Sequence, residues 1–262
     1  MEVVLKDVSY NRCYFNASIN SNEITGITGV NKESLLETIS LTKSIKGNIS
    51  IDGEQITNKN INKYSKKISV VKKNLKEKLF LDTIEENMLY EIKLRRLKLK
   101  DYNKKMQDSL RIVGLNKSYL SREIKTLSKS EMILINISIS LLSNPDIILL
   151  DDPFVYLDKK NDKKLYRILV RLKDQFNKLI VISSNNSNIL YKYTDKIILL
   201  KDNEVLIEGN TSSIYTDVKY LEENKFEIPD IVLFAYKAKK KGVKLNYHKD
   251  IRDIIKDIYK HV

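Results

Sequence analysis

Three short runs of uninterrupted aliphatic residues, at 147–150, 179–182 and 197–200, constrain the fold of this chain more than any other feature. Each run is short enough for a strand, and the segment 160–176 between the first two has helical periodicity. A strand that is apolar throughout is buried on both faces, which is typical of parallel sheets covered by helices. The sequence therefore predicts an α/β fold with a parallel sheet.

Weaker patterns extend this prediction to the rest of the chain. Strand patterns occur at 3–5, 14–19, 23–28, 47–53 and 68–71, and a helix pattern covers 33–41. From about 82 to 142 the periodicity is helical, and a capping box from Ser128 to Glu131 opens the last helix of that stretch. After Gly209 the pattern indicates helices only, and four isoleucines of the final helix are expected to be buried as one stripe, namely Ile251, Ile254, Ile255 and Ile258.

Composition excludes several kinds of chemistry. The net charge of +13 favours an acidic partner such as a membrane surface, a nucleic acid or a phosphate ligand. The two histidines, His248 and His261, lie near the end, so nothing before residue 248 uses histidine chemistry. A single cysteine, Cys13, excludes an intrachain disulfide and a Cys-rich zinc site, and is expected to be a buried small hydrophobe. No apolar run approaches the roughly 18 residues of a membrane span, and we expect a soluble cytosolic protein.

Two adjacent carboxylates follow the first aliphatic run. Asp151 and Asp152 stand at the carboxyl end of a predicted buried strand, which is the edge where ligands bind in open α/β sheets. Paired carboxylates at this edge suit magnesium and water handling in phosphoryl transfer. Taken alone, the pair is equally compatible with a solvated acidic turn.

The segments around these carboxylates resemble the ATP-binding-cassette (ABC) ATPase family. About twenty residues upstream lies Leu127-Ser128-Lys129-Ser130-Glu131, where that family has its signature motif Leu-Ser-Gly-Gly-Gln, and Asp151-Asp152-Pro153 is similar to the family's Asp-Glu-Pro. The segment 23–29 resembles the strand leading into the phosphate loop, and 83–87 resembles the family's Thr-Val-Glu-Glu segment. The resemblance implies a P-loop NTPase (ABC ATPase) core over 1–210, with an inserted α-helical subdomain at about 82–142.

The end of the chain narrows the resemblance to one subfamily of ABC ATPases. The segments 228–235 and 240–242 and the isoleucine stripe resemble the C-terminal helical extension of energy-coupling factor (ECF) transporter ATPases, which implies such an extension over 211–262. ECF transporters take up vitamins or metal ions. The resemblance further implies a dimer, in which each Mg-ATP lies between one subunit's phosphate loop and the other's signature motif. It also implies a transmembrane coupling protein as partner, and a cytoplasmic, peripheral location at the inner face of the membrane.

The phosphate loop departs from the family pattern. A working loop reads Gly-x-x-x-x-Gly-Lys-Ser/Thr, so that successive backbone N–H groups wrap the phosphates. The corresponding nucleotide-binding positions here are Gly29, Asn31, Lys32, Glu33 and Ser34, together with Asp151. Either about three loop residues are missing, or Asn31 replaces the last glycine and the strand is shortened. In both registers Lys32 matches the phosphate lysine. Glu33 takes the position of the magnesium-binding hydroxyl, where it is a possible magnesium ligand with Asp151.

The other catalytic positions are substituted as well. Lys73 replaces the glutamine that helps to position magnesium and water, and Lys129 and Ser130 replace the two signature glycines. Asp152 replaces the catalytic glutamate, and Asn185 falls where the family has its switch histidine. Near the position of the adenine-stacking aromatic stand Arg12 and, as a possible substitute, Tyr10.

These departures predict weak or absent binding of Mg-ATP. Loss of two charge-assisted N–H bonds costs about 3–6 kcal/mol, and a carboxylate about 4 Å from a phosphate adds roughly 4 kcal/mol of repulsion. We therefore expect a degenerate pseudo-ATPase that pairs with a competent paralogous ATPase subunit or with a second copy of itself. One alternative is an active ATPase that uses Lys73, Glu33 and Asp152. A less favoured one is a nucleic-acid-binding or regulatory protein, and no nucleic-acid partner is expected. A basic helix segment (Lys93, Arg95, Arg96, Lys98 and Lys100) is either solvated or faces an acidic partner.

Overall fold

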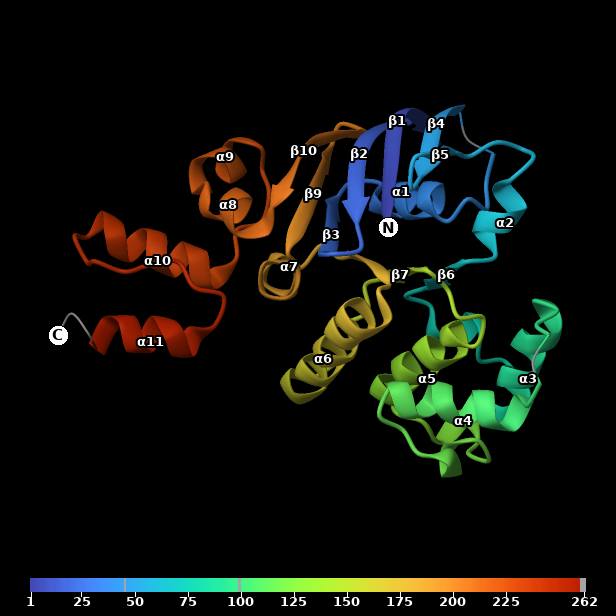
Figure 1. Cartoon of the computed structure of the whole chain (residues 1–262). Helices are drawn as coiled ribbons and strands as arrows, with labels where there is room; N and C mark the ends of the chain where they lie inside the picture. Colours follow the sequence, from blue (N-terminus) through green and yellow to red (C-terminus); the bar gives the residue numbers. More distant parts are fainter. Residues whose placement is uncertain (45, 99, 260–262) are drawn as a thin grey trace.

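The computed structural model describes residues 1–44, 46–98 and 100–259, and His261 lies outside this range (Figure 1). The strands are β1 (Glu2–Tyr10), β2 (Cys13–Asn20), β3 (Ile24–Gly29), β4 (Lys46–Ile51), β5 (Glu54–Gln55), β6 (Ile68–Val71), β7 (Ile147–Asp151), β8 (Leu179–Ser183), β9 (Lys196–Lys201) and β10 (Glu204–Asn210). The α-helices are α1 (Lys32–Ile39), α2 (Ile61–Ser65), α3 (Ile84–Leu94), α4 (Tyr102–Ile112), α5 (Lys129–Leu141), α6 (Lys159–Phe176), α7 (Ser187–Tyr193), α8 (Thr211–Thr216), α9 (Val218–Glu223), α10 (Asp230–Lys240) and α11 (Ile251–Tyr259).

One ten-stranded sheet runs in the order β5-β4-β1-β2-β10-β9-β3-β8-β7-β6. Strands β6, β7, β8, β3 and β9 are parallel neighbours, as the three aliphatic runs predicted. The prediction of a parallel sheet is incomplete, because β1, β4 and β5 pair antiparallel with their neighbours and β10 pairs antiparallel with β9. The sheet is therefore mixed. The antiparallel half consists of hairpins and half-exposed strands, whose patterns do not specify strand direction.

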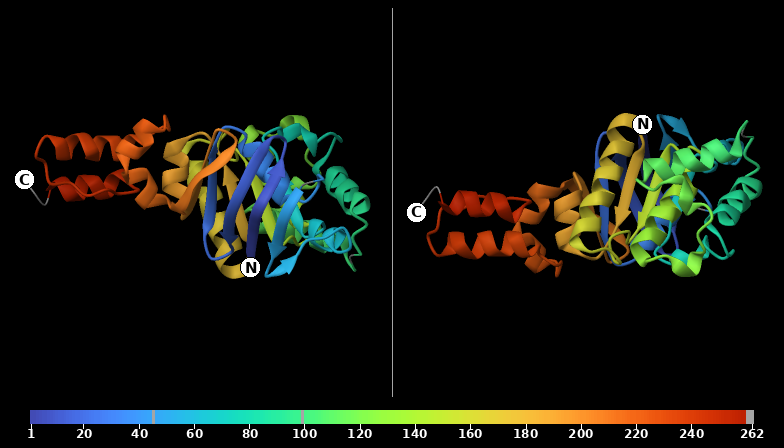
Figure 2. Two further views of the ribbon diagram at one scale, coloured as in Figure 1. Left: turned by 90° about the horizontal axis from the view of Figure 1, so that it is seen from above. Right: turned by 90° about the horizontal axis from the view of Figure 1, so that it is seen from below.

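Alternate residues of the aliphatic runs enter two separate cores. Leu149, Val181 and Ile198 pack with helix α1 on one face of the curled sheet (Figure 2). Ile148 and Ile180 pack on the other face, with α5, α6 and α7. Cys13 is fully buried in the α1 core, as expected. Burial on both faces explains why these strands are apolar throughout.

Helices α3, α4 and α5 form a group beside the parallel half of the sheet (Figure 1). The predicted capping box of Ser128 and Glu131 is present at the start of α5, and Thr83 and Glu86 form a second, unpredicted one at α3. Buried residues Met88, Met106 and Leu110 join this group to the core of the sheet. In the described part of the chain, none of the helices combines the length and the apolar character that crossing a membrane requires.

After β10 the described chain contains helices only, and α10 and α11 form a hairpin that projects from the body of the molecule (Figure 2). The predicted burial of the isoleucine stripe is only half right. Ile254 is buried against α10 and Ile258 is partly buried, but Ile251 and Ile255 are 56% and 46% exposed. A two-helix hairpin covers only one side of α11, so the stripe is wider than the surface that α10 offers it.

Candidate nucleotide-binding site

The turn between β3 and α1 is unusually short. Strand β3 continues to Gly29 and helix α1 begins at Lys32, so only Val30 and Asn31 connect them. Gly29 has φ 107°, and a Cβ at this position would lie 2.0 Å from the carbonyl oxygen of Leu200. Asn31 adopts the left-handed conformation, with φ 63°, just before the helix. The strand is complete and the loop is short, which favours the register in which loop residues are missing.

The cationic groups of the site are bound to its own carboxylates. Lys32 Nζ lies 2.7 Å from Glu33 Oε1 and 3.9 Å from Asp152 Oδ2. Lys73 Nζ lies 3.3 Å from the same Asp152 oxygen. Two lysines and two carboxylates thus sum to zero charge, and Lys32 is buried, with 6% of its side chain exposed. The sequence predicted these four residues for one site, and the structure brings them together.

Both shifts of pKa in this cluster follow from the ion pairs. Burial alone would raise the pKa of Glu33, but the hydrogen bonds from Lys32 Nζ and from the backbone N–H of Glu33 outweigh it and lower the pKa. The hydrogen bond to Asp152 raises the pKa of Lys73. The carboxylate of Glu33 therefore lies at the N-terminus of α1 and is held there by a lysine and a helix N–H, which is how a phosphate group is held at such a position.

Asp151 and Asn185, the two other site residues expected at the carboxyl edge of the sheet, lie outside this cluster of ion pairs. Asp151 accepts a hydrogen bond of 2.7 Å from Ser183 Oγ, which joins the ends of β7 and β8. Asn185 is exposed in the loop after β8 and lines a second cavity together with Gly29 and Val30. In the described residues, no group of three or more His, Cys, Asp or Glu side chains has the arrangement of a metal site.

The residues expected at the signature motif lie at the start of α5, within the helical group and away from α1 (Figure 1). Glu131 accepts hydrogen bonds from the backbone N–H of Ser128 at 2.8 Å, from Tyr119 at 2.7 Å and from Arg122 at 2.6 Å. Burial opposes these bonds, but together they lower the pKa of Glu131 to about 2. Leu127 is buried, Ser130 lies next to the Tyr156 carbonyl, and the exposed Lys129 lies 4.7 Å from the Tyr156 ring centroid.

Tyr10 and Arg12, the residues near the expected adenine-stacking position, have different surroundings. Tyr10 donates a hydrogen bond of 2.7 Å to Glu37 on helix α1, and this bond raises the pKa of Tyr10. Arg12 is exposed in the turn that follows β1. The ring of Tyr14 at the start of β2 is 57% exposed. Sequence reasoning did not select Tyr14, because an aromatic residue in an alternating strand pattern carries no separate signal.

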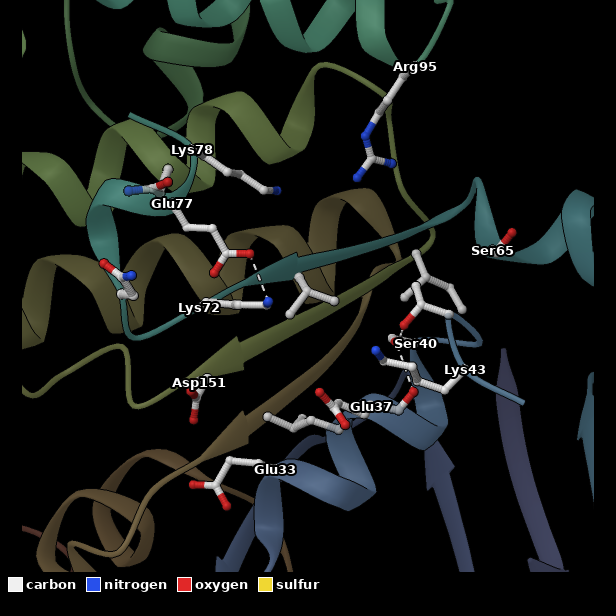
Figure 3. Close-up of a pocket in the computed structure, with 16 residues that line it drawn as sticks. Glu33, Glu37, Ser40, Lys43, Ser65, Lys72, Glu77, Lys78, Arg95 and Asp151 are labelled. Carbon is white, nitrogen blue, oxygen red and sulfur yellow. Dashed lines mark hydrogen bonds and ion pairs between the residues drawn. The ribbon is translucent and has the colours of Figure 1, made fainter. Parts of the chain in front are cut away.

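A cavity of about 510 Å³ lies between α1 and the helical group (Figure 3). Glu33 and Glu37 of α1 line one side together with Asp151, and Lys72, Lys78 and Arg95 lie across from them (Figure 3). Sequence reasoning named Arg95 as part of a basic segment but did not identify Lys78, Glu37 or the cavity. These residues are brought together only by the packing of the helical group on the sheet, which local patterns do not reveal.

A parallel sheet with a strand–turn–helix unit at its carboxyl edge, and a lysine at the start of that helix, is the architecture of the P-loop class of α/β proteins. Comparison with known proteins agrees. A family model described as ABC transporter matches residues 14–155, which is more than half of the chain. The chain belongs to the ABC transporter family, and proteins of this family bind Mg-ATP.

Individual relatives are similar over most of the chain. The energy-coupling factor transporter ATP-binding protein EcfA2 of Staphylococcus aureus strain USA300 is 28% identical over 236 residues, covering 88% of this chain and 81% of that protein. Its counterpart in the bovine strain RF122 is 28% identical over 223 residues, covering 83% and 78%.

Solved structures have the same fold. The structure of CbiO1 from Clostridium perfringens has a TM-score of 0.73 at 20% identity and covers 84% of this chain and 93% of that one. The cassette MJ0796, described as a dimer bound to ADP and phosphate, has a TM-score of 0.67 at 25% identity, with 80% and 98% covered.

Proposed function

We propose that this chain is an ATP-binding-cassette subunit of an ECF-type transporter that takes up a vitamin or a metal ion, and that it does not itself turn over ATP. Its similarity to EcfA2 over 88% of the chain supports the transporter class. We propose the region 1–210 as the cassette, with the helical subdomain at about 82–142, and 211–262 as the ECF-type extension.

The ion pairs of Lys32 are the observation that carries the pseudo-ATPase proposal. A bound phosphate needs this lysine, yet Glu33 lies 2.7 Å from its ammonium and Asp152 lies 3.9 Å away. ATP would have to displace Glu33 while leaving a carboxylate beside its own negative charge. At about 4 Å and an effective dielectric of 20 this repulsion is at most roughly 4 kcal/mol, and solvent screening at the 59% exposed side chain of Glu33 reduces it to about tenfold in affinity.

The short loop removes a second part of the phosphate site. A phosphate loop holds its ligand with several successive backbone N–H groups, and only Val30 and Asn31 separate β3 from α1. Magnesium fits no better, because Lys73 and Lys32 already lie against Asp152, and Asp151 is hydrogen-bonded to Ser183. Mg-ATP therefore does not fit the residues of this site as they stand.

The complex that we propose has two partners. A competent paralogous ATPase subunit forms a heterodimer with this chain, or a second copy takes its place, and the signature Ser128 faces the partner's ATP. A transmembrane coupling protein binds the dimer at the inner face of the membrane, where this chain is a peripheral cytoplasmic subunit.

A calorimetric titration of the purified chain with ATP, with and without magnesium, tests the proposal. We expect no binding up to millimolar ATP and no phosphate release. Micromolar, magnesium-dependent binding would instead select the alternative of an active ATPase that uses Lys73, Glu33 and Asp152. In that case Lys32→Ala should abolish both binding and hydrolysis.

A further inference from the structure

Positive charge is concentrated on the surface where helix α3 ends and helix α4 begins, which we call the α3–α4 basic surface. Five basic side chains are exposed there, namely Lys93, Arg96, Lys98, Lys100 and Lys104. Among the described residues, the ion pairs of this helical group involve other side chains, and none of the five takes part in one. The charge of this surface is therefore open to a partner.

The acidic side chains nearby do not balance this charge. Asp101 is the only acidic residue in the segment 93–107, and it accepts a hydrogen bond of 2.9 Å as the N-terminal cap of α4. Glu91 is nearly buried and lies 2.6 Å from Arg95, so it is already paired. The other two carboxylates of α3, on Glu85 and Glu86, lie in its first turn, at the opposite end of the helix. Five exposed cations thus face one exposed carboxylate.

Large apolar side chains are exposed among these cations. Leu94 is 63% exposed, and Tyr90 lies one turn before it on the same face of α3, with 42% exposed. Tyr102, at the start of α4, is 47% exposed. Phe80 packs edge to face against Tyr90, with ring centroids 4.9 Å apart. Lysine and arginine interleaved with exposed leucine and tyrosine is typical of surfaces that lie in the headgroup region of a membrane.

We propose that the α3–α4 basic surface binds anionic lipid headgroups directly. The inference rests on the proposed function, which brings the subunit to a membrane, and it adds a contact with lipid to the contacts with protein partners. Each lysine or arginine close to an anionic membrane surface strengthens binding about fivefold. Helix α3 lies at the end of the molecule opposite the C-terminal hairpin, where it can meet an extended surface (Figure 2).

The apolar side chains favour lipid over a nucleic acid, which offers the same charge. Single-stranded bases stack on flat aromatic rings. Leu94 is the most exposed of the four apolar side chains and has no ring, and Phe80 and Tyr90 pack against each other. An aliphatic side chain gains from leaving water for the boundary between headgroups and acyl chains.

Vesicle co-sedimentation of the purified full chain tests this contact without a partner protein. We expect binding to vesicles that contain phosphatidylglycerol, release of the chain by high salt, and little binding to phosphatidylcholine alone. A variant that combines Lys93→Gln, Lys98→Gln and Lys100→Gln should bind about a hundredfold more weakly, at about fivefold for each lysine. The matched control replaces three exposed lysines of α6 by glutamine, namely Lys159, Lys160 and Lys163, and should bind like the wild type. Thermal unfolding of both variants reports on the fold.

A fluorescent probe identifies which surface meets the membrane. The chain contains no tryptophan, so one introduced residue reports on a single position. We expect the emission of Leu94→Trp to shift to shorter wavelength on anionic vesicles. Val243→Trp is the matched probe, because Val243 is 47% exposed and flanked by lysines after α10, at the other end of the molecule. Its emission should not change.

Four results would overturn the inference. They are equal binding to neutral and anionic vesicles, full binding by the triple-lysine variant, and a shift of Val243→Trp in place of Leu94→Trp. The fourth is tighter binding to mixed-sequence RNA than to anionic vesicles, lost in the same variant, which would select a nucleic-acid partner. None of them bears on the proposed function, because the ATP titration tests that separately, and ATP binding there would leave the lipid contact unaffected.

Discussion

At the scale of single residues, the charged side chains of the candidate nucleotide-binding site form ion pairs with one another. The sequence identified Lys32, Glu33, Lys73 and Asp152 as members of one site, because each falls on a motif position. It could predict that Glu33 repels a phosphate, since that follows from its place at the helix start. The ion pairs themselves could not be predicted, because the pairing of Lys73 with Asp152 at 3.3 Å joins residues 79 positions apart.

Replacement of Glu33 by serine should improve nucleotide binding without restoring hydrolysis. Glu33→Ser removes the carboxylate beside Lys32 and supplies a hydroxyl, but the loop still has two residues. We expect ATP binding to become detectable at about millimolar ATP, where the wild type shows none, and the gain is only about tenfold because solvent screens part of the repulsion at the 59% exposed side chain. Calorimetric titration measures the difference. Glu85→Ser removes a first-turn carboxylate from α3 and should have no effect.

Glu131 should make stability depend on pH. Its pKa is about 2 in the folded chain against an ordinary value of 4.5, so the charged form stabilises the folded state above pH 4.5. This contribution is lost as the pH falls from 4.5 towards 2. We expect Glu131→Gln to lower the free energy of unfolding by about 1–2 kcal/mol at pH 7, after allowance for solvent screening. Denaturant unfolding should show that the gap between wild type and variant closes below pH 3, and a gap independent of pH would contradict this.

At the scale of elements, the sequence predicted best the strands that are buried on both faces of the sheet. The strands β7, β8 and β9 were predicted because continuous aliphatic runs specify them, and α5 because its capping box and periodicity agree. Strand β10 was not identified, because Glu204–Asn210 is only half-buried and lacks an alternating pattern. The direction of β1 and β4 was also open, since strand patterns carry no information on which neighbour a strand will pair with. The two-residue strand β5 was not predicted at all.

Position 29, at the end of β3, should tolerate no residue larger than glycine. Gly29→Ala places a Cβ against the backbone of Leu200 and forces alanine to φ 107°, so we expect a loss of at least about 3 kcal/mol in the free energy of unfolding. Gly53→Ala is the matched control, because Gly53 has φ 78° but its Cβ would meet nothing within 4 Å. It should cost about 1 kcal/mol. Denaturant unfolding measures both, and equal losses would show that contact with β9 is unimportant.

At the scale of the whole molecule, the helices after β10 are tied to the loop that carries Asn185. Glu227 accepts a hydrogen bond of 3.1 Å from the Ser187 N–H at the start of α7. Asn188 and Asp230 exchange two hydrogen bonds, of 3.0 and 2.8 Å. The sequence predicted helices here but not this connection, because its partners are about 40 residues apart and none of them belongs to a recognisable motif.

Removal of this connection should loosen the chain between α9 and α10. Asn188→Ala deletes both hydrogen bonds to Asp230, each of which contributes about 1 kcal/mol. We expect the Asp230 amide to exchange its hydrogen about tenfold faster, as measured by hydrogen exchange with mass spectrometry. Asn62→Ala, at an exposed position of α2, should leave the exchange unchanged. Unchanged exchange in Asn188→Ala would show that the helices are held by apolar packing alone.

The carboxylate of Glu33 occupies the start of α1 in the way a phosphate group would, and this has a consequence for the cooperativity of a dimer. In the heterodimer that we propose, this half of the interface needs no nucleotide to balance Lys32. Closure would then depend on one ATP, bound at the partner's loop, and the dose–response of transport to ATP would be hyperbolic, with a Hill coefficient of about one. The ion pair between Lys32 and Glu33 would thus make closure of the complex respond to a single bound ATP.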